Sequence, residues 1–237
     1  MGLDMRPTGK SKPGFEERYK ELSEIIQRKE KRGLSLADKL NARKKLSKEE
    51  LFLALEWFRI QIKSYETIQA PRVGRDKEAD NWLRQKYLET DKQLSETEFL
   101  RIHDGYYVIE LAKEKDGLPV YHSLKGDANV FSGEFLKVCA DLIGQDLVRE
   151  ARETKIATEA LDYGRRLMKI ADKIAREKKL LYLKDQREQP ETNSEALESK
   201  LHIVFSLARW LIFYGERGHG VEVEFRIGKG GREPPFF

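Results

Sequence analysis

The chain of 237 residues is long enough to form one large domain or two small ones. Charged residues make up 36% of it and apolar residues 39%, a balance that indicates a soluble, highly charged and helix-rich protein. It contains no run of about 18 apolar residues, and the N-terminus lacks the apolar stretch of a signal peptide. We therefore expect neither a membrane span nor a membrane partner.

Cys139 is the single cysteine of the chain. It cannot form an intramolecular disulfide, and one thiol cannot supply the cysteine ligands of a structural zinc site. Its position on the apolar side of a predicted helix favours a buried packing role over that of a nucleophile. These points predict a cytoplasmic protein that carries no cofactor.

The net charge of +4 is unevenly distributed. Residues 1–48 hold 14 Lys and Arg against 7 Asp and Glu, a balance of +7, and the remainder holds 31 against 34, a balance of −3. A basic N-terminal quarter would suit an acidic partner or phosphate groups. Short helices with a solvated charged face are the simpler explanation of the same composition.

The chain begins with residues 1–14, in which prolines and glycines predict an irregular arm. A helix is predicted over 15–32, where apolar residues recur at helical spacing. Ser47 and Glu50 form a capping box that opens a helix over 48–69. The apolar stripe of that helix consists of Leu51, Leu55, Phe58, Ile62 and Tyr65, widened by Phe52 and Trp57.

Another amphipathic helix is predicted over 75–90, and Ser95 with Glu98 forms a second capping box before a short helix. The pattern then changes from helical to β-like. Residues 106–111 and 119–124 are rich in β-forming side chains and flank an Asp-Gly turn pair, which predicts a hairpin.

The longest predicted helix covers 145–179 and carries small and apolar residues at alternating steps of three and four. Small residues let a neighbouring helix approach closely, and we expect that neighbour to be 201–214, which is apolar nearly all round. Thr192 and Glu195 form a third capping box, which is expected to start the helix that contains 201–214. The small-residue stripe consists of Ala157, Ala160, Gly164, Leu167, Ala171 and Ile174.

Val221–Arg226 alternates apolar and charged side chains, which predicts a half-buried strand. Three glycines precede it, Gly215, Gly218 and Gly220, and they favour a sharp change of chain direction. Because they follow a helix and precede a strand, they lack the order of elements that a phosphate-binding loop requires. We expect the strand to pair with the predicted hairpin.

These elements predict a mostly helical α+β protein, with a bundle-like array of about eight helices and a small antiparallel sheet of two or three strands. Strands and helices do not alternate as they do in a doubly wound sheet. We expect a single domain over 1–237, with a weak seam near 92–104 as the one candidate boundary.

Three residues near the predicted hairpin are the best candidates for catalysis. His103 and His122 would form an acid–base or metal cluster with Glu110 if the loop between them folds back, as in a hydrolase. No two histidines have the spacing of a common metal motif. The simpler interpretation places His103 at a helix C-terminus, where the helix dipole favours it, and His122 on the surface of a strand.

Basic residues gather in two regions that could contact an anion or a nucleic acid. The N-terminal group consists of Arg28, Lys29, Arg43, Lys44 and Lys45. The second group, Arg165, Lys169 and Lys173, shares one face of the long helix, opposite its small-residue stripe. Acidic residues lie between the cations, and this mixture is also typical of ordinary solvent-facing surfaces.

The sequence as a whole favours a protein without catalytic activity that binds another macromolecule. Another protein is the expected partner, with the chain acting as an adaptor or an inhibitor. Trp and Tyr residues left on the surface would anchor such a contact. Binding of nucleic acid through the basic helix faces is the first alternative, and a hydrolase built on His103 and His122 is the second.

Overall fold

The fold is seen in a computed structural model, which describes residues 2–31, 47–89, 93–115 and 130–226. The α-helices are α1 (Glu16–Lys31), α3 (Lys48–Arg59), α4 (Ser64–Thr67), α5 (Lys77–Leu88), α6 (Glu96–Ile102), α7 (Ala140–Ile143), α8 (Gln145–Glu150), α9 (Ala157–Glu177) and α10 (Leu197–Glu216). Four 3₁₀ helices are η1 (Ile109–Leu111), η2 (Lys113–Lys115), η3 (Gly133–Cys139) and η4 (Leu181–Lys184). The strands are β1 (Gly2–Pro7), β2 (Lys10–Ser11), β3 (Gln61–Ile62), β4 (Phe131–Ser132) and β5 (Val221–Arg226).

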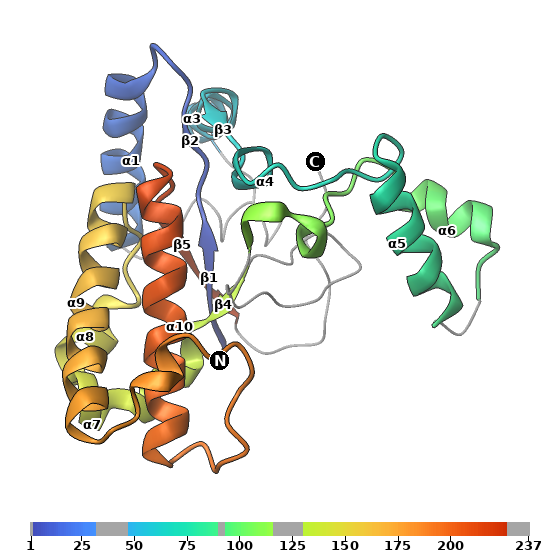
Figure 1. Cartoon of the computed structure of the whole chain (residues 1–237). Coiled ribbons are helices and arrows are strands. Elements are labelled where there is room, and N and C mark those ends of the chain that lie inside the picture. Colours follow the sequence, from blue (N-terminus) through green and yellow to red (C-terminus); the bar gives the residue numbers. More distant parts are fainter. Residues whose placement is uncertain (1, 32–46, 90–92, 116–129, 227–237) are drawn as a thin grey trace.

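Helices α9 and α10 lie antiparallel and side by side at the centre of the main core (Figure 1). The predicted close approach is confirmed, because a Cβ atom added to Gly164 would lie only 2.8 Å from Leu211 Cβ. Gly215 makes the reciprocal approach, since a Cβ atom added to it would lie 2.9 Å from Leu161 Cβ. Packing this tight excludes larger residues at the two glycines and fixes the register of the pair.

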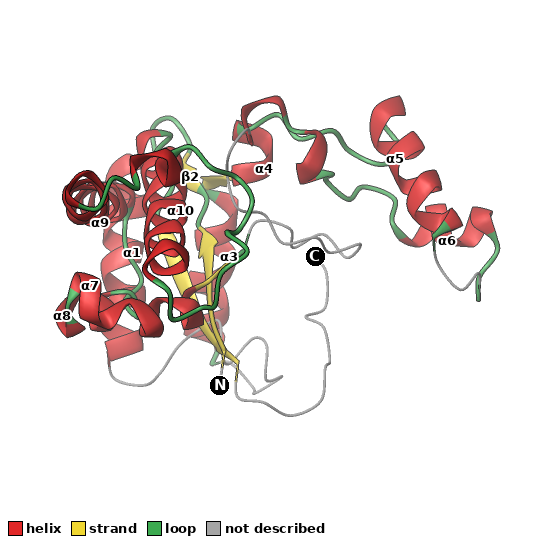
Figure 2. Cartoon of the chain, turned by 60° about the horizontal axis from the view of Figure 1, so that its bottom comes forward, coloured by secondary structure: helices red, strands yellow, loops and turns green. Residues whose placement is uncertain are grey.

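The other side of α10 covers a three-stranded antiparallel sheet with the order β4-β1-β5. Strand β1 pairs along its whole length with β5, from Gly2 opposite Arg226 to Pro7 opposite Val221. Figure 2 shows the sheet behind α10, on the side away from α9. Trp210 lies between the two layers and contacts Phe131 of β4, with ring centres 6.2 Å apart. The predicted class, mostly helical α+β with a small antiparallel sheet, is therefore confirmed.

The first residues were wrongly predicted to form an irregular arm, since they supply the central strand β1. Met5 of this strand is fully buried in the main core. Strand β5 was correctly predicted, and it pairs with β1; the described first half of the expected hairpin does not pair with it. Strand β2 continues the N-terminal segment and pairs with β3, so this segment belongs to two sheets.

The hairpin prediction fails in its first half. Ile109–Leu111 forms the 3₁₀ helix η1, and Tyr107 makes only an isolated bridge to Arg72. The second half, 119–124, lies outside the described residues.

Two long predicted helices are interrupted by β contacts. The helix expected over 48–69 ends at Arg59, because the following residues form β3 and pair with β2. The helix expected over 145–179 divides into α8 and α9, because Lys155 makes a backbone bridge to Val221. Long-range hydrogen bonding outweighs the helical preference of the local sequence at both places.

The capping boxes have different outcomes. Ser47 and Glu50 form both hydrogen bonds of a capping box, and Ser95 Oγ accepts from the backbone N–H of Glu98. The third box is wrong, because α10 begins at Leu197. Thr192 instead lies beside the first turn of α10, with its hydroxyl 2.7 Å from that of Ser199.

Helices α5 and α6 stand apart from the other helices in both views (Figures 1 and 2). They share a small apolar cluster of their own, formed by Val73, Ala79, Leu83, Phe99 and Val108. The seam suggested near 92–104 coincides with α6, inside this cluster. A single domain over 1–237 stays a prediction. Among the described residues, no helix is long and apolar enough to cross a bilayer.

Candidate functional surfaces

His103 is a buried residue at the C-cap of α6. Its Nδ1 atom lies 2.7 Å from the carbonyl oxygen of Phe99, and its ring packs against the rings of Phe99 and Tyr106. Glu110 accepts a hydrogen bond from the indole N–H of Trp82. His122 lies outside the described residues, so the proposed His103–His122–Glu110 cluster, and the hydrolase hypothesis with it, stays a prediction.

Cys139 is fully buried at the end of η3. Its Sγ atom lies 3.6 Å from the carbonyl oxygen of Lys200, and burial raises the pKa of the thiol to about 12. A thiol with this pKa is protonated at neutral pH and is a poor nucleophile. Among the described residues, no three His, Cys, Asp or Glu side chains gather in a group that could hold a metal ion.

The N-terminal basic group is only partly described. Arg28 lies exposed on α1, and its guanidinium is 3.5 Å from the carboxylate of Glu24. Lys29 lies in α1, but its side chain is not described, and residues 43–45 lie outside the described part of the chain. The structure therefore does not place these residues on one surface.

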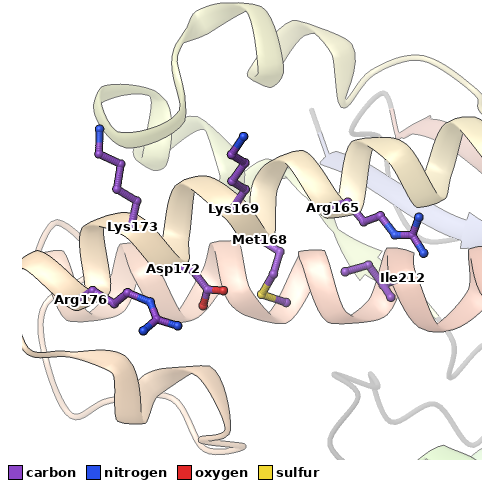
Figure 3. A pocket seen from close by; sticks show the side chains of 7 residues that line it. All are labelled: Arg165, Met168, Lys169, Asp172, Lys173, Arg176 and Ile212. Atoms are coloured by element: carbon purple, nitrogen blue, oxygen red, sulfur yellow. The ribbon is translucent and has the colours of Figure 1, made fainter.

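The basic residues of α9 do share one face. Arg165, Lys169 and Lys173 are exposed, and Arg176 continues their row toward the C-terminal end of the helix. Figure 3 shows Arg165 and Arg176 at the two ends and the lysines between them. We call these four side chains the α9 basic row. Arg176 flanks the predicted group, and its spacing of three residues from Lys173 places it on the same face.

Two acidic residues close to the α9 basic row, Asp162 and Asp172, are paired with other cations. Asp172 accepts a 3.0 Å hydrogen bond from Lys184, and Asp162 accepts a 2.8 Å bond from Arg166. Within the described chain, Lys169, Lys173 and Arg176 form no ion pair, and Arg165 has only a distant partner, Glu216, at 3.8 Å. The row thus carries positive charge that its own surface does not neutralise.

A shallow groove of about 490 Å³ runs along the row between α9 and α10. Met168 of α9 and Ile212 of α10 form its apolar floor, and Asp172 lies beside them (Figure 3). The cations therefore border a surface that can also contact apolar groups.

Helix α3 presents a different kind of surface. Its inner side is held by α1, because Trp57 stacks on Tyr19 with ring centres 4.7 Å apart and Glu56 accepts two hydrogen bonds from Arg18 at 2.9 and 2.7 Å. The outer side carries four large apolar side chains that are between 46% and 64% exposed. They are Leu51, Phe52, Leu55 and Phe58, and we call them the α3 apolar face.

A second cavity, of about 410 Å³, lies where α1 meets the start of α9. Lys155 is buried beside it, where Nζ donates to the carbonyl oxygens of Glu150 and Glu153 and lies 4.9 Å from the centre of the Tyr163 ring. Burial lowers the pKa of Lys155 to about 8. Arg166 forms a two-pronged contact with the Glu150 carboxylate, so the charged groups here pair with one another.

Comparison of the chain with protein-family models, with curated proteins and with solved structures found no match.

Proposed function

We propose that this protein acts without catalysis of its own, by binding another protein as an adaptor or an inhibitor, and that the α3 apolar face is its contact surface. The observation that supports the proposal is the exposure of Leu51, Phe52, Leu55 and Phe58 on one side of a single helix. Scattered exposed apolar residues are normal, whereas a contiguous group of this size is typical of an interaction site.

The energetics favour a partner for this face. Complete burial of an exposed large apolar side chain contributes about 1.5–3 kcal/mol. The four side chains are between 46% and 64% exposed, so roughly half of that amount per residue is available for binding. The two phenylalanines supply aromatic area of the kind that dominates protein interfaces. Positions 51, 55 and 58 follow helical spacing, which suits a helix that docks in an apolar groove of its partner.

The face is also held rigidly enough to bind. The Tyr19–Trp57 stack and the Arg18–Glu56 ion pair anchor α3 on its inner side, and the capping box at Ser47 and Glu50 stabilises its first turn. A helix positioned before binding loses less conformational entropy when the complex forms.

The proposal is tested by substituting Phe52→Ser together with Phe58→Ser. The matched control is Phe135→Ser with Tyr182→Ser, two aromatic residues exposed elsewhere on the chain. Tagged proteins are expressed in the source cell, and co-purified partners are measured by quantitative mass spectrometry. We expect a partner recovered equally with the wild type and the control, and at least tenfold less with the α3 variant. Equal recovery with the α3 variant would contradict the proposal.

A further inference from the structure

We propose that the groove between α9 and α10 is a second binding site, which holds the phosphodiester backbone of a single-stranded nucleic acid against the α9 basic row. This site is separate from the α3 apolar face and rests on different observations. The two surfaces belong to different helices, and each can be changed without the other.

The first observation is the uncompensated charge. Two acidic residues next to the row, Asp162 and Asp172, are already occupied by Arg166 and Lys184. Lys169, Lys173 and Arg176 are exposed and form no ion pair within the described chain, and Arg165 has only the distant Glu216 as a partner. Neutralising phosphates with such cations releases counterions from the nucleic acid, and this release supplies the main free energy of binding.

The second observation is the spacing along α9. Arg165, Lys169 and Lys173 follow one another at steps of four residues, which is about 6 Å along the axis, and the row from Arg165 to Arg176 extends roughly 16 Å. A stacked strand rises about 3.4 Å per nucleotide, so the row matches the length of about five nucleotides.

The row is also wider than a single line. At about 100° per residue its members spread over an arc of about 80° around the helix. A rigid acidic helix would reach only the cations that lie along one line. A flexible strand with a charge on every nucleotide can meet all four, which favours a nucleic acid over an acidic protein.

The third observation is the apolar floor. Met168 and Ile212 line the groove together with the cations and lie on the side of the row that faces α10 (Figure 3). Single-stranded nucleic acids expose sugars and base faces that contact such a surface, whereas a duplex keeps its bases stacked inside. The combination of a cationic border and an apolar floor therefore indicates a single strand.

The test measures fluorescence anisotropy of a labelled 20-nucleotide poly(dT) strand, with the full chain titrated at several salt concentrations. The site variant is Lys169→Glu with Lys173→Glu. The matched control is Lys77→Glu with Lys113→Glu, two exposed lysines on α5 and η2 that change the net charge by the same amount. Unchanged circular dichroism and thermal midpoints establish that both variants fold.

We expect the wild type to bind with a log–log salt slope of about −3, which corresponds to four phosphate contacts in a single strand. The site variant binds at least tenfold more weakly, with a slope shallower by about 1.4. The control stays within twofold of the wild type, and so does the Phe52→Ser, Phe58→Ser variant, because α3 takes no part.

Four results would overturn the proposal. They are the absence of poly(dT) binding by the wild type at low salt, an equal loss of affinity in the control, tighter binding of a 20-base-pair duplex, and displacement of the strand by poly-L-glutamate at equal charge concentration. The last result would assign the row to an acidic protein.

Discussion

His219 and Thr8 lie 211 positions apart in the chain, yet Nδ1 of the imidazole is 2.8 Å from the carbonyl oxygen of Thr8. A carbonyl only accepts, so Nδ1 carries the hydrogen and donates it. Nε2 lies 2.9 Å from the Thr67 hydroxyl, which can donate to it. The fully buried, neutral ring thus connects the end of β1, helix α4 and the turn before β5.

This ring predicts a loss of stability in acid. Burial lowers the pKa of His219 to about 4 from its ordinary value near 6.5. Between these pH values the His219 imidazole binds a proton in the unfolded chain but not in the folded chain. The free energy of unfolding therefore falls as the pH falls from 6.5 to 4. We expect the wild type to lose about 3 kcal/mol more than His219→Gln over this range. Urea denaturation at several pH values measures the difference, and parallel curves for the two proteins would contradict it.

Lys155 predicts a dependence of the same sign, a rise of stability with pH, in the alkaline range. Its pKa is lowered to about 8, so between pH 8 and 10.5 the unfolded chain binds more protons than the folded chain and stability rises with pH. The free energy of unfolding of the wild type, relative to Lys155→Met, should increase by about 3 kcal/mol across this window. Guanidinium titrations from pH 7 to 10.5 test the prediction, which fails if the difference is constant.

The substitution Gly164→Ala should lower the stability of the protein, although alanine usually stabilises a helix relative to glycine. Alanine is favoured over glycine by about 1 kcal/mol in a helix interior. Its Cβ atom would, however, lie 2.8 Å from Leu211 Cβ and 3.1 Å from the carbonyl oxygen of Ala208, which forces α9 and α10 apart. We expect Gly164→Ala to lose about 1–2 kcal/mol in net stability. Thermal unfolding measures the loss, with Glu177→Ala on exposed α9 surface as a control that should change little.

The thiol of Cys139 should react with a thiol reagent only when the protein unfolds. It is buried, its pKa is raised to about 12, and the chain has no other cysteine. Ellman's reagent at pH 8 should therefore leave the native protein unmodified and modify one thiol per chain in 6–8 M urea, conditions that unfold most domains. Rapid labelling without denaturant would show that η3 opens readily.

Substitutions on the α3 apolar face should leave the free energy of unfolding nearly unchanged. Phe52 and Phe58 are each 64% exposed, so their replacement by serine removes little buried area. The free energy of unfolding of this double variant should stay within about 0.5 kcal/mol of the wild type per substitution. Phe99→Ser, in the buried cluster of α5 and α6, is the contrasting variant and should lose several times more. A comparable loss in both variants would show that the α3 face is packed.

Local patterns predict the parts of this fold that local interactions determine. The small residues around Gly164 predict the α9–α10 contact, because only a close neighbour explains their spacing. Ser47 and Ser95 predict helix starts through hydrogen bonds within one turn. The break at Lys155 could not be predicted this way, since it depends on Val221, which is distant in sequence.

The N-terminal strand shows why one element was missed. Leu3, Asp4, Met5 and Arg6 alternate in the manner of a half-buried strand, but the flanking glycines and prolines concealed this short signal. Its partner β5 has a clearer alternation, yet nothing in either segment specifies the pairing. A partner for β5 could only be assigned from the fold.

Of the two candidate surfaces, the sequence could predict the α9 basic row but not the α3 apolar face. Helical periodicity alone places Arg165, Lys169 and Lys173 on one face. The exposure of Phe58 could not be derived from periodicity, because an apolar stripe usually faces the core. The contact of Trp57 with Tyr19 shows which side of α3 is anchored and which side stays open.

The pairing of β1 with β5 also has a consequence during synthesis. Gly2–Pro7 leaves the ribosome long before Val221–Arg226 is synthesised. The strand that will occupy the centre of the sheet therefore lacks its partner β5 during most of synthesis. Exposed edges of this kind invite pairing with other chains. Asp4 and Arg6 place charges on the waiting strand, and Pro7 lacks the N–H group that an intruding strand would need. Pro7, which helps to conceal β1 in the sequence, therefore also hinders pairing of this strand with other chains before β5 is made.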